Sequence, residues 1–217
     1  MKKNRPTGQD TTQTHHKKPK QYDRDYFDRW YRDHRLKIDG PADLARKVGM
    51  VVRLTEYLLD RPIRTVLDVG CGEGRWLAPL RALRPNIDYR GIDSSEYAVE
   101  RFRKTRGIQL GSLENLHQLG LSDPVDLCIC ADTLHYVPTK ELRTGLATIN
   151  KLTRGMAFLE VLTTADGAGG DLTGFIRRTP TFYRKHFQEA GFHQCGPHCW
   201  IPRKTAAGLA ALEWSGE

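Results

Sequence analysis

The sequence has no long apolar run and few cysteines, and each absence excludes a class of protein. No stretch of about 18 apolar residues occurs, which argues against a membrane span. Residues 1–20 lack the apolar middle of a secretory signal. The five cysteines are an odd number in a chain of 217 residues, which is long enough to build a core without disulfides. We therefore expect a soluble, cytoplasmic protein that does not enter a membrane.

The cysteines also lack the pattern of a complete metal site. The nearest approach is the stretch HQCGPHCW, in which His193, Cys195, His198 and Cys199 resemble half of a zinc site. A second pair with the spacing of zinc ligands is missing elsewhere in the sequence. We therefore predict no metal, and we expect a terminal pair of strands with buried thiols.

Positive charge is in excess, with a formal net charge of +8 at pH 7. Residues 1–20 hold six basic residues and one acid, so this segment alone carries +5 and the rest of the chain carries +3. The segment has no hydrophobic period, which predicts a disordered basic tail. A nucleic-acid partner is therefore expected only through residues 1–20.

An aromatic period follows this basic segment. Tyr22, Tyr26 and Trp30 recur every four residues up to His34, so one face of a helix here would be aromatic. Two interpretations stay open. The face packs against the core, or the helix lies across the mouth of a pocket as a lid.

Helical and strand patterns alternate from Pro41 onward. A helix is predicted up to Asp60, because Gly40 and Pro41 suit a helix start and an apolar stripe follows. Further helices are predicted near 75–82, 95–104, 140–152 and 180–190, and strands at 64–70, 89–93, 108–111, 125–131 and 155–161. Such alternation predicts a mostly parallel sheet with helices on both faces, because each parallel return requires a crossover. Residues 163–174 are too rich in glycine for regular structure and are expected to form a mobile loop or lid.

The stretch TVLDVGCGEGRW places Gly70, Gly72 and Gly74 directly after the first predicted strand. In an open α/β sheet this loop is the backbone nearest to a ligand, and glycines permit positive φ and close approach. The dinucleotide fingerprint requires a glycine at the sixth position, where this sequence has Arg75, so the spacing argues against NAD. Asp68, two residues before the first glycine, offers an acceptor to a ligand cation such as an ammonium group.

The run from Asp68 to Gly74 resembles motif I of the class I S-adenosylmethionine-dependent methyltransferases. The stretch RGID ends in Asp93, which matches the family's acidic residue after the second strand and could accept from both ribose hydroxyls. VDLCICADTLHYV resembles the family's fourth strand and the turn after it, and YRKHFQEAGF resembles its last helix. The resemblance covers roughly residues 40–200. It implies an α/β fold with a Rossmann-like, doubly wound, mostly parallel seven-stranded sheet, and S-adenosylmethionine as cofactor.

The resemblance also implies which residues contact the cofactor. These are Asp68, Gly70, Cys71, Gly72, Asp93, Ser94, Ser112, Leu113 and Ala131. Ser112 departs from the family, because many relatives have an acidic residue there for the adenine amino group. Each assignment has a structural alternative: Asp68 could bond to backbone in the glycine turn, Asp93 could cap the next helix, and Ser112 could lie in an ordinary turn.

The implied reaction is an in-line transfer of a methyl group from a sulfonium to a nucleophile, which depends mostly on alignment, so a general base is optional. His135, four residues past Ala131, is the first candidate for a base, with a pocket-lining role as its alternative. Glu160, near the end of the fifth predicted parallel strand, is the second candidate. Arg177, Arg178 and Tyr183 could hold an anionic substrate, or the two arginines could lie at a solvated helix start.

A nearly neutral catalytic domain favours a small-molecule acceptor methylated on an oxygen or nitrogen atom. The alternatives are an RNA or protein methyltransferase that uses the basic residues 1–20, and a cofactor-binding partner without turnover. The predicted organisation is a disordered basic tail over 1–20, a class I methyltransferase domain with an N-terminal helical lid over 21–205, and a C-terminal tail over 206–217.

Overall fold

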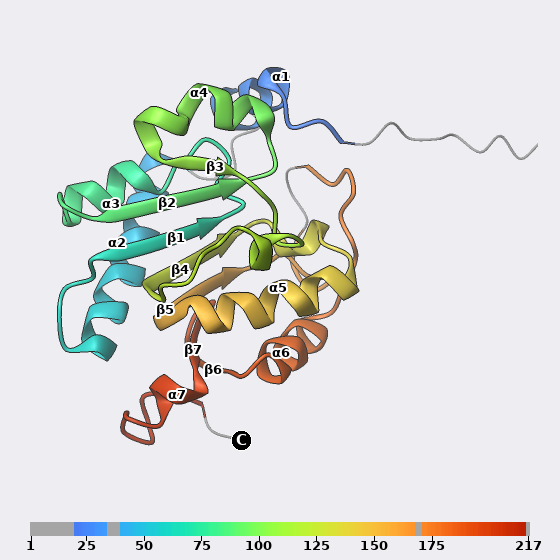
Figure 1. Cartoon of the computed structure of the whole chain (residues 1–217). Coiled ribbons are helices and arrows are strands. Elements are labelled where there is room, and N and C mark those ends of the chain that lie inside the picture. Colours follow the sequence, from blue (N-terminus) through green and yellow to red (C-terminus); the bar gives the residue numbers. More distant parts are fainter. Residues whose placement is uncertain (1–19, 34–39, 168–170, 216–217) are drawn as a thin grey trace, which may run out of the picture.

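The computed structural model describes residues 20–33, 40–167 and 171–215 (Figure 1). A seven-stranded sheet runs through the molecule in the order β3-β2-β1-β4-β5-β7-β6. The strands are β1 (Thr65–Val69), β2 (Asp88–Asp93), β3 (Ile108–Leu110), β4 (Val125–Ala131), β5 (Thr153–Glu160), β6 (Phe192–Gly196) and β7 (Cys199–Pro202). The first five strands pair in parallel, whereas β7 is antiparallel to both β5 and β6. The predicted α/β fold with a mostly parallel, seven-stranded sheet is confirmed.

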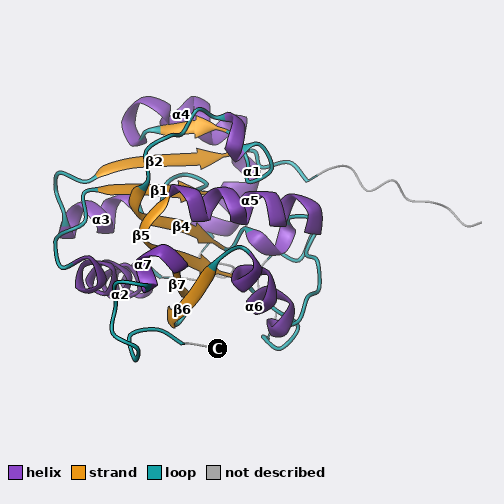
Figure 2. Ribbon diagram, turned by 60° about the horizontal axis from the view of Figure 1, so that its bottom comes forward, coloured by secondary structure: helices purple, strands orange, loops and turns teal. Residues whose placement is uncertain are grey.

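Helices cover both faces of the sheet (Figure 2). The helical segments are α1 (Arg24–Phe27), the π-helical turn η1 (Asp28–Arg32), α2 (Pro41–Leu59), α3 (Leu77–Leu83), α4 (Glu96–Arg106), η2 (Leu116–Gln118), η3 (Leu134–Tyr136), α5 (Thr139–Leu152), α6 (Pro180–Glu189) and α7 (Arg203–Ala206). The core on one face includes side chains of α2, α3 and α7, and the core on the other face includes those of α5 and α6. Alternate residues of β4 divide between the cores: Leu127 and Ile129 belong to the first, Cys128 and Cys130 to the second.

The strand order brings the functional loops to one edge. β1 lies between β2 and β4, so the chain crosses to opposite sides of β1 in the two halves of the sheet. The arrowheads of β1, β2 and β4 point to the same edge in Figure 1. In sheets of this kind, ligands bind beyond the carboxyl ends of the strands at the point where the order reverses.

Local sequence signals set the bounds of the predicted helices. Pro41 is the first residue of α2, and the Asp43 carboxylate accepts a hydrogen bond from the Gly40 amide at 3.2 Å. The helix ends at Leu59, and the next residue, Asp60, has a left-handed φ of 50°. Thr179 caps α6 by accepting from the Phe182 amide at 3.2 Å.

The aromatic segment folds as two short pieces rather than one helix. α1 is followed by η1, in which the Asp33 amide donates to the Asp28 carbonyl at 3.1 Å, five residues back. Phe27 is buried, with its ring 5.7 Å from that of Tyr97. An ion pair of 2.7 Å between Arg32 and Glu73 joins the segment to the glycine loop. His34 lies outside the described residues, as do residues 1–19 of the predicted tail and residues 168–170 of the glycine-rich loop.

The described residues of the C-terminal segment, up to Ser215, contact the rest of the protein. The Trp214 ring lies 4.3 Å from that of His193 on β6, and the Ser215 amide donates to the Gln194 carbonyl at 2.8 Å. The Tyr57 hydroxyl on α2 bonds to Glu213 at 2.6 Å. These later residues therefore extend the packing at the edge of the sheet through Ser215, and the predicted domain bounds stay a prediction.

Two further findings concern the described ranges. No helix within residues 20–33, 40–167 and 171–215 is both long enough and apolar enough to cross a membrane. The same residues contain no cluster of three His, Cys, Asp or Glu side chains placed to hold a metal ion. His193 and Cys195 lie on β6 and Cys199 on β7, all as members of the predicted terminal strand pair, which is confirmed.

Candidate functional site

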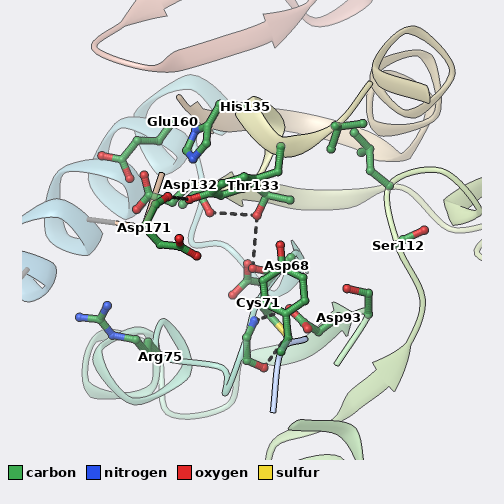
Figure 3. A pocket seen from close by; sticks show the side chains of 18 of the residues that line it. Asp68, Cys71, Arg75, Asp93, Ser112, Asp132, Thr133, His135, Glu160 and Asp171 are labelled. Atoms are coloured by element: carbon green, nitrogen blue, oxygen red, sulfur yellow. Dashed lines mark hydrogen bonds between the residues drawn. The ribbon is translucent and has the colours of Figure 1, made fainter. Parts of the chain in front are cut away.

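A cavity of about 400 Å³ lies beyond the carboxyl ends of the parallel strands. All the residues predicted to contact the cofactor or to act as a base line it: Asp68, Gly70, Cys71, Gly72, Asp93, Ser94, Ser112, Leu113, Ala131, His135 and Glu160. Asp68, Cys71 and Asp93 gather on one side of the cavity, whereas His135 and Glu160 lie on the other (Figure 3). The sequence prediction therefore selected residues that share one cavity, and their individual roles stay predictions.

The glycine loop follows β1 and lies very close to two side chains. Gly70 and Gly72 have φ of +75° and +54°, which few other residues adopt. A Cβ atom on Gly70 would lie 2.1 Å from the Thr133 hydroxyl oxygen, and one on Gly72 would lie 2.4 Å from the Tyr31 hydroxyl oxygen. The glycines are therefore needed both for the turn and for contact with the loop after β4 and with the aromatic segment.

This contact predicts that Gly72→Ala destabilises the fold more than Gly74→Ala. Both glycines have positive φ, +54° and +73°, so each substitution should cost about 1 to 2 kcal/mol of backbone strain. A Cβ atom on Gly74 meets only ordinary contacts, from 3.4 Å, whereas one on Gly72 also displaces Tyr31. We expect an additional loss of about 1 to 3 kcal/mol for Gly72→Ala in denaturant unfolding. Equal losses for the two variants would mean that Tyr31 moves away without cost.

Asp93, the last residue of β2, combines a structural role with spare hydrogen-bonding capacity. Its carboxylate accepts from the Gly72 amide at 2.6 Å and from the Ser95 amide at 2.8 Å. The side chain of Ser95, not Asp93, caps α4 by accepting from the Ala98 amide. Burial raises the pKa of Asp93, and the two amides oppose that rise. A carboxylate has about four acceptor positions, so two remain for ribose hydroxyls.

Asp68 is an acid held in an apolar setting. It is 2% exposed and accepts a hydrogen bond of 2.7 Å from the Tyr89 hydroxyl. Burial raises the pKa of Asp68 to about 7, and the charge of Asp93 acts in the same direction. A ligand cation beside this carboxyl would favour its ionised form. The geometry supports the predicted role as a partner for an ammonium group.

Ser112 and Leu113 follow β3 at the cavity wall. The Ser112 amide donates to the Asn115 side-chain oxygen at 2.8 Å, which is the ordinary turn considered as an alternative for Ser112. Leu113 is buried against Gly145 of α5, where a Cβ atom would lie 2.2 Å from it. Ser94 is exposed at the cavity and Ala131 is half-buried. These residues form the wall at which the adenine contacts are predicted.

His135 has a geometry that argues against the predicted general base. It is 1% exposed, and burial together with the charge of Lys20 lowers its pKa to about 4. The Leu162 amide donates to its Nδ1 atom at 3.3 Å. Because that nitrogen accepts, the neutral ring holds its proton on Nε2, which can donate a hydrogen bond but cannot take up a proton.

This tautomer predicts a small effect of His135→Ala on turnover. Loss of a general base typically costs about 10² to 10⁴ fold, whereas we expect less than about tenfold with unchanged cofactor affinity. The exposed His117 provides the matched control, because His117→Ala removes the same ring away from the cavity. A loss above about a hundredfold would restore the general-base role.

Glu160, the second candidate base, is part of an ion pair. Its carboxylate oxygens lie 2.8 and 2.9 Å from the Lys47 ammonium of α2. The ion pair occupies both carboxylate oxygens of Glu160. The pair joins α2 to the end of β5 at the cavity wall.

The cavity has functional candidates that the sequence reasoning missed. Tyr136 and Asp171 line it, and the Lys20 ammonium lies 2.5 Å from the Asp171 carboxylate. These residues are far apart in the chain, and no local pattern joins them. The aromatic period did indicate a further part of the wall, which is formed by Tyr22, Tyr26, Phe27, Trp30 and Tyr31.

The arginines considered for an anionic substrate are not part of the cavity lining. Arg178 is 7% exposed and donates to the Val137 carbonyl at 2.8 Å and to the Thr139 hydroxyl at 3.1 Å. Its guanidinium therefore links the segment before α6 to the short connection between η3 and α5. This arrangement gives no support to an anion site at Arg177 and Arg178.

Known proteins share this architecture. Residues 66–155 match the family model described as a methyltransferase domain. DesVI of Streptomyces venezuelae is similar in structure, with 14% identity, 75% of this chain and 93% of that chain covered, and a TM-score of 0.60. The sugar N-methyltransferase KedS8 of Streptoalloteichus sp ATCC 53650 is 17% identical, with 74% of this chain and 88% of that chain covered and a TM-score of 0.58. CalS10, an amino pentose methyltransferase of Micromonospora echinaspora, is 17% identical, with 70% of this chain and 86% of that chain covered and a TM-score of 0.54. No curated protein matches the sequence.

Proposed function

Because this chain has a class I S-adenosylmethionine-dependent methyltransferase domain, we propose that it transfers a methyl group to an oxygen or nitrogen atom of a small molecule. The observation that carries the proposal is the size and the lining of the cavity. It has a volume of about 400 Å³, and its wall includes aromatic residues from the N-terminal segment. Pockets of this size suit a compact ligand, whereas a polymer needs an open groove.

The donor set fits S-adenosylmethionine. Asp93 keeps two acceptor positions for ribose hydroxyls beyond its bonds to Gly72 and Ser95. Asp68 offers a buried carboxyl to an ammonium group. Leu113 lines the cavity between β3 and η2, where its amide could donate a hydrogen bond to an adenine ring.

The chain's contribution to the reaction is alignment and exclusion of water. When bound, the cofactor supplies a methyl group on a sulfonium, which a nucleophile displaces. Holding two reactants in line contributes about 7 to 11 kcal/mol to such a displacement. Tyr26, Phe27 and Tyr31 form part of the cavity wall, and Phe27 and Tyr31 lie next to Gly72 of the glycine loop. His135 can orient an acceptor by donating from Nε2, because its Nδ1 is engaged.

The named neighbours support a small acceptor. KedS8 and CalS10 are described as a sugar N-methyltransferase and an amino pentose methyltransferase. We extend that substrate size, not the substrate itself, to this chain. The competing proposal is methylation of RNA or protein held by the basic residues 1–20, which rests on the net charge of +5 in that segment.

The test combines calorimetry with methyl transfer. We expect the full chain to bind S-adenosylmethionine and its demethylated product, but not NAD, and to transfer labelled methyl groups to members of a panel of small alcohols and amines. A variant without residues 1–19 should keep both properties. A truncated protein that binds the cofactor normally but loses all turnover would favour the polymer substrate. On duplex nucleic acid, log affinity would then fall with log salt at about −0.9 per phosphate contact.

A further inference from the structure

The Lys20 ammonium lies inside a cage of three tyrosines. Its Nζ atom is 3.8 Å from the ring centre of Tyr136, 4.9 Å from that of Tyr22 and 5.2 Å from that of Tyr26. The Asp171 carboxylate lies 2.5 Å away, and the Lys20 side chain is 14% exposed. Three aromatic faces and one carboxylate around a cation form the arrangement with which proteins bind alkylammonium groups.

The cage belongs to the cavity that contains the predicted cofactor residues. Tyr22, Tyr26, Tyr136 and Asp171 all line it. The Tyr136 ring lies 4.3 Å from that of His135, and the charge of Lys20 contributes to the lowered pKa of His135. Asp171 and His135 border the same space in Figure 3. A group in the cage would therefore lie beside the reaction centre.

The cage residues are held by contacts that do not involve Lys20. The Tyr136 hydroxyl donates to the Asp171 carbonyl at 2.5 Å, and the Asp171 carboxylate accepts from the Thr173 amide at 2.9 Å. The Tyr22 carbonyl accepts from the Ser95 hydroxyl at 2.5 Å. The rings of Tyr22 and Tyr26 meet edge to face at 5.0 Å. The cage is thus a preformed site that Lys20 fills.

The charge of the cavity selects for a cation. Its lining has seven carboxylates, which are Asp68, Asp93, Glu114, Asp132, Glu141, Glu160 and Asp171, against the two basic side chains Lys47 and Arg75. An anionic acceptor would be repelled, and a neutral one would gain little from the tyrosine faces. The Lys20 side chain is largely shielded from solvent, and burial lowers its pKa despite Asp171.

We propose that this cage binds an alkylammonium group of the methyl acceptor, and that Lys20 fills it as an internal competitor when no acceptor is present. The inference rests on the proposed function and adds a substrate class to it, a small alkylamine, whose ammonium group loses one proton to solvent before its nitrogen accepts the methyl group. An acceptor must displace Lys20, so the apparent affinity falls by the fraction of molecules in which the cage is open. Removal of the Lys20 side chain should abolish this competition.

The test uses n-butylammonium, which matches the alkyl chain of lysine, and 1-butanol as the neutral control. Binding to the full chain without cofactor is followed by shifts of the tyrosine ring signals in NMR. We expect Lys20→Ala to bind n-butylammonium about tenfold more tightly than the unmodified protein, with no comparable gain for 1-butanol. The matched control Lys104→Ala removes an exposed lysine of α4 and should change nothing.

A second variant tests the cage itself. In the Lys20→Ala background, Tyr136→Leu should abolish the gain, whereas Tyr136→Phe keeps the ring and should retain most of it. Equal affinity of the unmodified protein and Lys20→Ala, or equal binding of 1-butanol, would overturn the inference. Calorimetry with S-adenosylmethionine on each variant separates the two proposals. Absence of cofactor binding would contradict the proposed function, whereas it would leave the binding of n-butylammonium in the cage unaffected.

Competition by a lysine peptide distinguishes the two sources of an alkylammonium group. A free alkylamine that is methylated, with a peptide that does not compete, supports the small-molecule substrate. A lysine peptide that competes and is methylated, while free amines are not, would support the cage and contradict the small-molecule proposal.

Discussion

Asp93→Ala is expected to weaken the binding of S-adenosylmethionine by about 1 to 3 kcal/mol, because two ribose hydroxyls lose their acceptor. The substitution also leaves the amides of Gly72 and Ser95 without the partners that they have at 2.6 and 2.8 Å. The glycine loop should therefore become less ordered, which adds to the loss. Calorimetric titration of the purified variant measures the effect directly.

Asp88→Ala is the matched control for this substitution. Asp88 is exposed at the opposite end of the same strand, β2, and its loss removes one carboxylate without touching the cavity. Its cofactor affinity should equal that of the unmodified protein. An unchanged affinity for Asp93→Ala as well would make Asp93 only an anchor for the backbone around it.

The second large effect is a pH dependence of cofactor binding that arises from Asp68. Burial raises the pKa of this carboxyl to about 7, so it is largely protonated in the free protein below that pH. An incoming ammonium group favours the ionised form, so binding below pH 7 must release a proton and becomes weaker as pH falls. We expect affinity about tenfold higher at pH 7.0 than at pH 5.5.

Asp68→Asn isolates this carboxyl from Asp93, whose pKa burial also raises. The amide keeps the shape of the side chain and cannot ionise, so the variant should bind the cofactor weakly with little change between the two pH values. The number of protons released follows from titrations in buffers of different ionisation enthalpy. A slope that persists in Asp68→Asn would assign the pH dependence to Asp93 instead.

Local sequence patterns were sufficient for the strands, most helices and the glycine loop. The strand TVLDV is followed within five residues by its three glycines, and Asp93 is recognised by its distance from them along the chain. These features depend on neighbours in sequence, and the structure has β1 and β2 at the predicted positions. The helix from Pro41 likewise follows from its first residues and its apolar stripe.

The cage could not be predicted in this way. Lys20 precedes both Tyr136 and Asp171 by more than a hundred residues in the chain, and only folding brings the three together. Lys20 was assigned to the basic tail because its charge resembles that of its neighbours in sequence. The protonation of His135 also depends on a distant group, the Leu162 amide, that no motif indicates.

The most direct test of the account is a crystal structure of the full chain with the demethylated cofactor product. We predict that both ribose hydroxyls lie within hydrogen-bonding distance of the Asp93 carboxylate, that the amino group of the ligand lies beside Asp68, and that its sulfur faces the side of the cavity with His135 and Tyr136. A ligand bound outside this cavity, or one whose ribose makes no contact with Asp93, would contradict the account.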